Sequence, residues 1–398
     1  MNTRNKKSKL CVMQVLPALV SGGVERGTID IATNLIKNGH QAIVVSSGGG
    51  LVEQLESVGA AHIKLPVQSK NPFIMWKNAR SLIKLISEHK VNLVHARSRA
   101  PAWSCFWATN CTKTPFITTF HGTYSHQNRF KKWYNAIMLR GDKTIAVSNF
   151  IADHINKIYL NSDLNPHLKY TPDIQIIHRG IDTKKFNPEV ITHNQIQQLK
   201  QQWDIPDNKT IIMLPARVTQ WKGHAVFIDA ISRLSSNDFV CLMVGDDQGK
   251  SAYREALDCA ITTNNLKNKF KFVGVCNDMP AAYKLADIVV SASTDPEAFG
   301  RVACEAQAMD CLVVATSHGG SLETIAPSQQ MLLCQPDNAI SMTQAIKAAL
   351  AIKPEQSIDI QIQSRKHIEE NFSLNKMCSD TLALYHQQVG NKKTGAQA

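Results

Sequence analysis

Two carboxylates and a helix start lie together in the segment 295–309. The segment follows an apolar, β-branched stretch at 288–292 that is typical of a buried strand, and a helix is expected to begin at about Phe299. The first N–H groups of a helix lack intrahelical partners and its dipole favours negative charge, so this geometry suits a phosphate. Because Glu297 and Glu305 would repel a phosphate, we expect them to accept hydrogen bonds from sugar or ribose hydroxyls. The segment therefore indicates a sugar-nucleotide site.

Two cations five residues apart, Arg217 and Lys222, follow a predicted strand at 210–214. They lie in a loop that continues into Gly223 and a helical pattern. Two fixed cations at this spacing suit a diphosphate, and they would neutralise a nucleoside diphosphate as it leaves. An ordinary surface ion pair is the alternative for these side chains.

Gly22 and Gly23 open a helical pattern near the N-terminus. Glycine lets the backbone approach a phosphate or an acceptor closely. Together with Gly27 they do not form the G-x-G-x-x-G pattern, so they are a poor dinucleotide signature. His121 follows another predicted strand, where either an active-site histidine or a structural one would fit.

The chain carries an excess of basic residues, with a net charge of +12 and a pI near 9.2. This charge favours an anionic partner such as a nucleotide, a nucleic acid or an acidic lipid. The stretch 129–143 mixes basic and aromatic residues at helical spacing, which is typical either of a helix on an anionic membrane or of a half-buried helix with a basic face. Arg97 and Arg99 could bind an acidic acceptor, or they could be solvated arginines of a structural loop. No nucleic-acid recognition motif is present, so we expect no nucleic-acid partner.

The composition is that of an ordinary globular protein, and 398 residues are enough for two domains. The ten cysteines are scattered without a C-x-x-C pair, which indicates reduced thiols in a cytosolic protein. A basic start followed by the apolar stretch 10–20 resembles a signal peptide, but Gln14 and Pro17 interrupt it, so we interpret it as a first strand. No apolar run is long enough to span a membrane.

Apolar β-branched runs alternate with helical patterns along the chain, which predicts α/β structure with parallel, doubly wound sheets. A polar segment rich in Gln and Lys interrupts this alternation once, and the alternation then resumes. In such sheets ligands bind beyond the carboxyl ends of the strands, so two halves would face each other across a central cleft. We expect an acceptor-binding domain over 1–185, a linker over 186–208, a donor domain over 209–372, a C-terminal helix over 373–390 that crosses back to the first domain, and a disordered tail over 391–398.

The order and spacing of several short motifs resemble the retaining GT-B glycosyltransferases of family 4, also called group 1, over nearly the whole chain. The Glu-x7-Glu spacing from Glu297 to Glu305 is the most specific of them. The other matching segments are 21–26, 120–122, 146–148, 178–182 with Phe186, 216–224, 244–246, 272–274 and 319–323. Each segment alone would be weak evidence, and the resemblance rests on the order in which they follow one another.

The resemblance implies roles for these residues. Glu305 would accept the ribose hydroxyls and Glu297 those of the donor sugar, while Arg217 and Lys222 would hold the diphosphate. His121 would lie beside the donor sugar. The remaining donor-binding residues would be Gly22, Gly23, Val273, Phe299, Gly300, Arg301 and Val302, with Val273 in a loop whose backbone holds the base.

No carboxylate other than Glu297 is a candidate nucleophile, and the resemblance places Glu297 on sugar hydroxyls. The resemblance therefore implies front-face chemistry, in which a leaving phosphate oxygen takes the acceptor proton. The paired cations would supply the charge that a metal would bring, so we expect no metal and no cofactor; Asp246 and Asp247 are the alternative metal ligands. After Glu305 the chain lacks the glycine and proline usual in the family, and Asp310 is expected to occupy a left-handed turn position there.

The predicted function is retaining, metal-independent transfer of a sugar from a nucleoside diphosphate, most simply UDP, to a lipid-linked or cell-envelope glycan such as lipopolysaccharide. The protein would be cytoplasmic, peripheral at the cytoplasmic face of the inner membrane. Two alternatives remain open, a GT-B epimerase acting on a UDP-sugar and a catalytically silent protein that binds sugar nucleotides.

Overall fold

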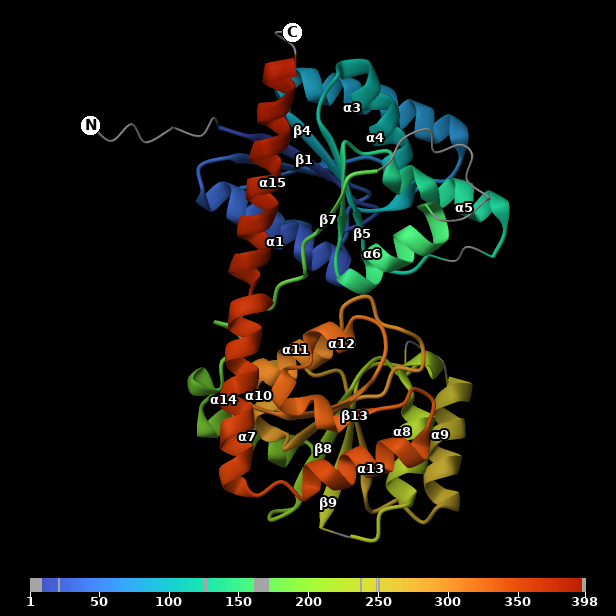
Figure 1. Cartoon of the computed structure of the whole chain (residues 1–398), viewed down its shortest axis with the longest axis vertical. Coiled ribbons are helices and arrows are strands. Elements are labelled where there is room, and N and C mark those ends of the chain that lie inside the picture. Colours follow the sequence, from blue (N-terminus) through green and yellow to red (C-terminus); the bar gives the residue numbers. More distant parts are fainter. Residues whose placement is uncertain are drawn as a thin grey trace, which may run out of the picture. The chain divides into compact units, whose positions relative to one another are not determined.

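The computed structural model describes residues 9–20, 22–124, 127–160, 172–236, 238–247, 249 and 251–395. The chain forms two compact units. Unit 1 comprises Met1–Arg179 with Asn375–Ala398, and unit 2 comprises Gly180–Leu374. Each unit is a parallel sheet with helices on both sides, as Figure 1 shows for the two halves separately. The predicted α/β class with two doubly wound, Rossmann-like units is confirmed.

Unit 1 contains a seven-stranded sheet in the order β3-β2-β1-β4-β5-β6-β7, in which every strand pair is parallel. Its strands are β1 (Cys11–Val15), β2 (Gln41–Ser46), β3 (Ala61–Lys64), β4 (Leu93–Ala96), β5 (Phe116–Phe120), β6 (Lys143–Ala146) and β7 (Ile174–Ile176). Its helices are α1 (Gly23–Lys37), α2 (Val52–Ser57), α3 (Pro72–Glu88), α4 (Arg99–Thr112), α5 (Arg129–Asn135), α6 (Asn149–Ile155) and most of α15 (Leu374–Gly395).

The strand order of unit 1 reverses between β1 and β4. From β1 the chain winds outward through β2 and β3, and from β4 it winds the other way. The loops after β1 and β4 therefore part at the carboxyl edge of the sheet, which is where ligands bind in such folds. The two strands are held in register up to this point, because Arg97 N donates to Val15 O at 2.9 Å.

Unit 2 repeats the plan with a six-stranded parallel sheet in the order β10-β9-β8-β11-β12-β13, which reverses between β8 and β11. Its strands are β8 (Thr210–Pro215), β9 (Phe239–Val244), β10 (Phe270–Gly274), β11 (Ile288–Ser291), β12 (Leu312–Thr316) and β13 (Leu333–Cys334). Its helices are α7 (His193–Gln202), α8 (His224–Ser232), α9 (Ser251–Thr263), α10 (Met279–Leu285), α11 (Arg301–Ala308), α12 (Ser321–Thr324), α13 (Ala339–Leu350) and α14 (Pro354–Asn371).

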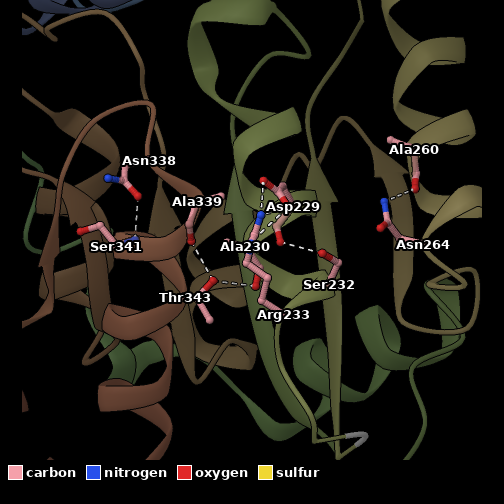
Figure 2. Close-up of polar contacts among 10 residues, drawn as sticks. All are labelled: Asp229, Ala230, Ser232, Arg233, Ala260, Asn264, Asn338, Ala339, Ser341 and Thr343. Atoms are coloured by element: carbon pink, nitrogen blue, oxygen red, sulfur yellow. Dashed lines mark hydrogen bonds and ion pairs between the residues drawn. The ribbon is translucent and has the colours of Figure 1, made fainter.

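Helices α8 and α13 of unit 2 are joined by a buried hydroxyl as well as by apolar packing. Thr343 Oγ1 lies 3.0 Å from Ala230 O and 2.7 Å from Ala339 O, as Figure 2 shows. Asn338 caps α13 by accepting from Ser341 N at 2.9 Å. A side-chain oxygen at this position satisfies a first-turn N–H group and sets where the helix begins. The Thr343 contacts hold α8 and α13 together within the unit whose sheet carries β8 and β11.

The boundaries of the units differ from those expected. The predicted linker over 186–208 lies inside unit 2, because Leu199, Trp203 and Ile205 are buried in its hydrophobic core. The C-terminal stretch from Asn375 belongs with unit 1. Helix α15 continues to Gly395, so residues 391–395 of the predicted disordered tail are helical, and 396–398 lie outside the described residues. Within the described part of the chain, none of the helices has the length and apolarity needed to cross a membrane.

Candidate functional site

The reversal point of the unit 2 sheet brings together the loops after β8 and β11. The first loop ends in a short turn at Gln220–Lys222, followed by Gly223 and the start of α8. Thr294 N donates to Trp221 O at 2.8 Å and ties the two loops together. Gly223 has a φ of +73°, and a Cβ there would lie 1.9 Å from Ala292 O. Only glycine allows this close approach, which delivers Lys222 to the end of β11.

Lys222 and Glu297 form an ion pair, with Nζ and Oε1 2.5 Å apart. Ser293 Oγ donates to the same Oε1 at 2.6 Å. The side chains of Lys222 and Glu297 are 14% and 12% exposed, so solvent screens the pair only partly. The sequence motifs identified Lys222 and Glu297, whereas Ser293 was missed; its position at the end of β11 was the available signal.

The loop that carries Glu297 is fixed by a glycine pair from the turn after β12. Gly320 N donates to Glu297 O at 2.7 Å. A Cβ on Gly319 would lie 2.6 Å from Glu297 O, and one on Gly320 would lie 2.5 Å from Phe299 Cα. His318 Nε2 also lies 2.9 Å from Ser293 O. This turn therefore sets the path of the chain into α11, with Gly300 as its left-handed N-cap.

Glu305 is 8% exposed, and internal groups hold both of its oxygens. Oε1 accepts from Arg301 Nε at 2.6 Å, and Oε2 accepts from Tyr283 OH at 3.1 Å. Burial, with the Glu305 charge as a further cause, raises the pKa of Tyr283 well above its usual value, so the phenol remains a donor. A carboxylate can accept more than two hydrogen bonds, so Glu305 keeps capacity for a ligand hydroxyl. Tyr283 was not identified from the sequence.

Of the other predicted residues of unit 2, Val302 lines a small pocket together with Lys222 and Glu297. Arg217 is exposed and makes no ion pair within the described part of the chain. Val273 is half-buried at the end of β10, next to Gly274 with its φ of +72°. Phe299 is buried in the hydrophobic core, and Val302 is partly buried at the start of α11. Among the described residues, no three His, Cys, Asp or Glu side chains are grouped to hold a metal ion.

A second cluster lies at the reversal point of the unit 1 sheet. Arg179 Nη2 donates to His121 Nδ1 at 3.1 Å. The pKa of His121 is well below its usual value because of burial and the neighbouring charges of Arg179 and Arg97. The ring is thus neutral, and since Nδ1 accepts, its proton is on Nε2. A Cβ on Gly23 would lie 2.1 Å from Arg179 Nη1, so the glycine at this helix start makes room for the guanidinium.

Arg97 and Arg99, predicted together as acceptor ligands, lie in different surroundings. Arg97 is 6% exposed and donates from Nη1 to Gln14 Oε1 at 3.1 Å. Arg99 donates to Asn135 Oδ1 at 2.9 Å and lies over the ring of Tyr124. The reason is local: β4 ends just before Arg97, whereas α4 begins at Arg99, so the two side chains leave the backbone in different directions.

Arg99 lines an aromatic groove of about 690 Å³ in unit 1. The groove is bounded by Trp103, Trp107, Phe130, Trp133 and Tyr134, with Lys70 and Lys131 among its basic residues. Of the predicted amphipathic helix, 129–135 form α5 and Ala136–Leu139 form a 3₁₀ turn. Phe130 is 72% exposed, so the aromatic face is not fully covered within unit 1.

Both halves of the chain match known glycosyltransferase families. The family described as Glycosyl transferases group 1 matches residues 195–371, and Glycosyltransferase Family 4 matches residues 21–185. A glycosyltransferase from Rickettsia africae is 40% identical, with a TM-score of 0.87, over 96% of this chain and 99% of that one.

Two more distant relatives share the fold or the sequence pattern over most of their length. HepE of Anabaena, solved in complex with UDP and glucose, is 21% identical with a TM-score of 0.77, over 97% of this chain and all of that one. A lipopolysaccharide core mannosyltransferase of Rhizobium leguminosarum is 21% identical over 81% of this chain and 86% of that one. Taken with the two family matches, these likenesses establish that the chain is a glycosyltransferase of family 4, group 1, with the GT-B fold.

Proposed function

We propose that this glycosyltransferase moves a sugar, with retention of configuration and without a metal, from a nucleoside diphosphate to a lipid-linked or cell-envelope glycan. UDP is the nucleotide we propose, since HepE was solved with UDP and glucose. The observation that carries the proposal is the Lys222–Glu297 pair, which lies where the unit 2 sheet reverses and beside the starts of α8 and α11. The cation suits the diphosphate of a sugar nucleotide, and the oxygen acceptor beside it suits the hydroxyls of the sugar.

The donor residues would act as follows. Lys222 would pair with the diphosphate, and Arg217, whose guanidinium is exposed, would add a second charge. Glu297, held by Ser293, would accept hydrogen bonds from the sugar hydroxyls. Glu305, held by Arg301 and Tyr283, would accept those of the ribose.

Retention of configuration would follow from a front-face reaction. Double displacement needs a carboxylate free to attack the anomeric carbon. Glu297 Oε1 already takes both an ammonium and a hydroxyl, which suits a hydrogen-bond acceptor better than a nucleophile. In the front-face reaction a leaving phosphate oxygen takes the acceptor proton, and the cations stabilise the diphosphate as its bond to the sugar breaks.

For the acceptor we propose a lipid-linked or lipopolysaccharide-type glycan at the cytoplasmic face of a membrane. The Rhizobium leguminosarum relative is named for the lipopolysaccharide core. Exposed aromatic side chains with lysines beside them, as on α5, are suited to the headgroup region of an anionic bilayer.

The test is a transfer reaction followed by NMR. UDP-sugars with an α-linkage would be incubated with a panel of lipid-linked and lipopolysaccharide core glycans in the presence of EDTA. The proposal predicts an α-linked product that depends on both substrates and is lost in Lys222→Met. A β-linked product, or a requirement for added divalent metal, would contradict the proposed mechanism. An altered UDP-sugar without acceptor would instead identify an epimerase, and nucleotide binding without any product would identify a silent binder.

A further inference from the structure

Arg97 is a buried cation that lies at the reversal point of the unit 1 sheet. Only 6% of the residue is exposed. The hydrogen bond of its guanidinium to Gln14 Oε1 uses one of five N–H donors. Its Nε has no hydrogen-bond partner within the described residues, and no ion pair involving Arg97 is found there either. Burying a guanidinium without a paired charge costs free energy of desolvation, and a bound anion would offset that cost.

Arg97 lines a small cavity together with further hydrogen-bond donors. The cavity has a volume of about 30 Å³ and is lined by Arg97, Arg179, His95, His121 and Thr119, with Gly23 and Gly27 on its helix side. His121 Nε2 is buried, has no hydrogen-bond partner among the described residues, and carries the ring proton. The start of α1 adds the positive end of a helix dipole. Two guanidiniums, an imidazole N–H and a helix start thus face one space.

Two carboxylates act on Arg97 without pairing with it. Asp30 and Glu25 are close enough to act on Arg97 electrostatically, but neither forms an ion pair with it in the described structure. Glu25 is also near Gly22, where a Cβ would lie 2.8 Å from its Oε2. His95 is engaged on both ring nitrogens, by Tyr385 OH at 2.7 Å and by Thr119 Oγ1 at 2.6 Å. His95 and its partners therefore hold the wall of the cavity and add no negative charge.

We propose that this cavity binds one oxyanion, a carboxylate or a terminal phosphate, carried by the glycan acceptor. The inference rests on the proposed function for the existence of an acceptor, and adds that the acceptor is acidic. The cavity, at about 30 Å³, is small, so it suits the head of a single anionic group better than a diphosphate. Arg97 and Arg179 would donate hydrogen bonds to the oxygens of the anion, and His121 Nε2 would donate a further one.

Gly27→Ala tests the site without removing any charge. A Cβ on Gly27 would lie 3.1 Å from Arg97 Nη2, so the methyl group occupies space that the anion would need. Alanine is also the better helix former, which offsets part of the strain of this tight contact. Gly390→Ala is the matched control, because it makes the same change inside α15 with no atom within 4 Å of the new Cβ.

The measurement is the melting temperature of the whole chain with inorganic phosphate, glucuronate, glucose or UDP, since ligands raise it by mass action. We expect phosphate and glucuronate, but not glucose, to raise it in the parent and in Gly390→Ala. The rise should be lost in Gly27→Ala and in Arg97→Met, and it should persist in Lys222→Met. An unchanged rise in Gly27→Ala and Arg97→Met would overturn the site.

The UDP measurements separate this proposal from the proposed function. UDP should still raise the melting temperature of Gly27→Ala, and it should raise that of Lys222→Met less than that of the parent. Loss of the UDP effect in Gly27→Ala would show that the oxyanion belongs to the donor, which would overturn the assignment to the acceptor. If UDP has no effect on the parent while phosphate and glucuronate do, the donor proposal fails and the anion site stands.

Discussion

Glu297→Gln should strengthen the binding of UDP while it lowers the turnover of a UDP-sugar. Glu297 Oε1 lies 2.5 Å from Lys222 Nζ, so the carboxylate would compete with a diphosphate for the same ammonium group. The amide removes both this competition and a negative charge beside the phosphate. The same change weakens the acceptor of the sugar hydroxyls, so chemistry with the complete donor should become slower.

The size of the effect follows from the burial of the pair. Exposed pairs contribute about 0.2–1 kcal/mol, and breaking a buried pair costs about 3–5 kcal/mol. With side chains 14% and 12% exposed, the pair should lie between these limits, at about 2 kcal/mol. If UDP binding breaks most of the Lys222–Glu297 interaction in the parent, the amide variant should bind UDP roughly tenfold more tightly, which corresponds to about 1.4 kcal/mol.

Calorimetric titration with UDP of the parent, Glu297→Gln, Lys222→Met and the double variant completes a double-mutant cycle. Lys222→Met should bind UDP more weakly than the parent, and Glu297→Gln should have little effect in that background because no ammonium is left to release. Weaker UDP binding in the single variant Glu297→Gln, or the same gain in both backgrounds, would refute the reasoning.

Three further predictions concern stability. Gly223→Ala should cost at least about 3 kcal/mol in chemical denaturation, because it adds a clash with Ala292 O at 1.9 Å to the strain of a left-handed backbone; Gly274→Ala, with nearly the same φ and open space, should cost only about 1 kcal/mol. Burial lowers the pKa of His224 from 6.5 to about 4, so the unfolded chain takes up its proton first as the pH falls. The contribution of neutral His224 to the free energy of unfolding is fully present above pH 6.5 and falls by about 3 kcal/mol as the pH declines toward 4. In His224→Gln the free energy of unfolding should therefore change less with pH over this range than in the parent. Gln307→Met should lower the unfolding free energy by about 2 kcal/mol, since the buried amide bonds Ala303 O, Thr324 O and Ala326 N; an unchanged denaturation midpoint would show that the network is dispensable.

The fold and the position of Lys222 and Glu297 at one edge of a sheet could be predicted because both depend on local patterns. Strand and helix periodicity gives a doubly wound sheet, and in such a sheet the loops after two particular strands meet where the order reverses. Lys222 and Glu297 lie in those loops, so motif order was enough to bring them together. Asp310 was also predicted correctly, because its φ of +61° lies in the left-handed region.

The parts that could not be predicted depend on tertiary contacts. The packing of residues 186–208 into unit 2 was not predicted, because their Gln-rich sequence indicates an exposed helix, whereas apolar side chains such as Trp203 are buried in the core. Arg179 reaches His121 from the segment after β7, and no spacing in the sequence indicates that contact. Tyr283 likewise supports Glu305 from another helix.

The most direct test of the central claim is equilibrium binding of UDP, GDP and ADP to the whole chain, in EDTA, with Lys222→Met compared to the parent. We expect UDP to bind the parent selectively, and Lys222→Met to lose at least about tenfold in affinity because a charge-assisted contact to the diphosphate is gone. Equal affinity of the parent and Lys222→Met for UDP would contradict the claim that the reversal point of unit 2 holds the donor.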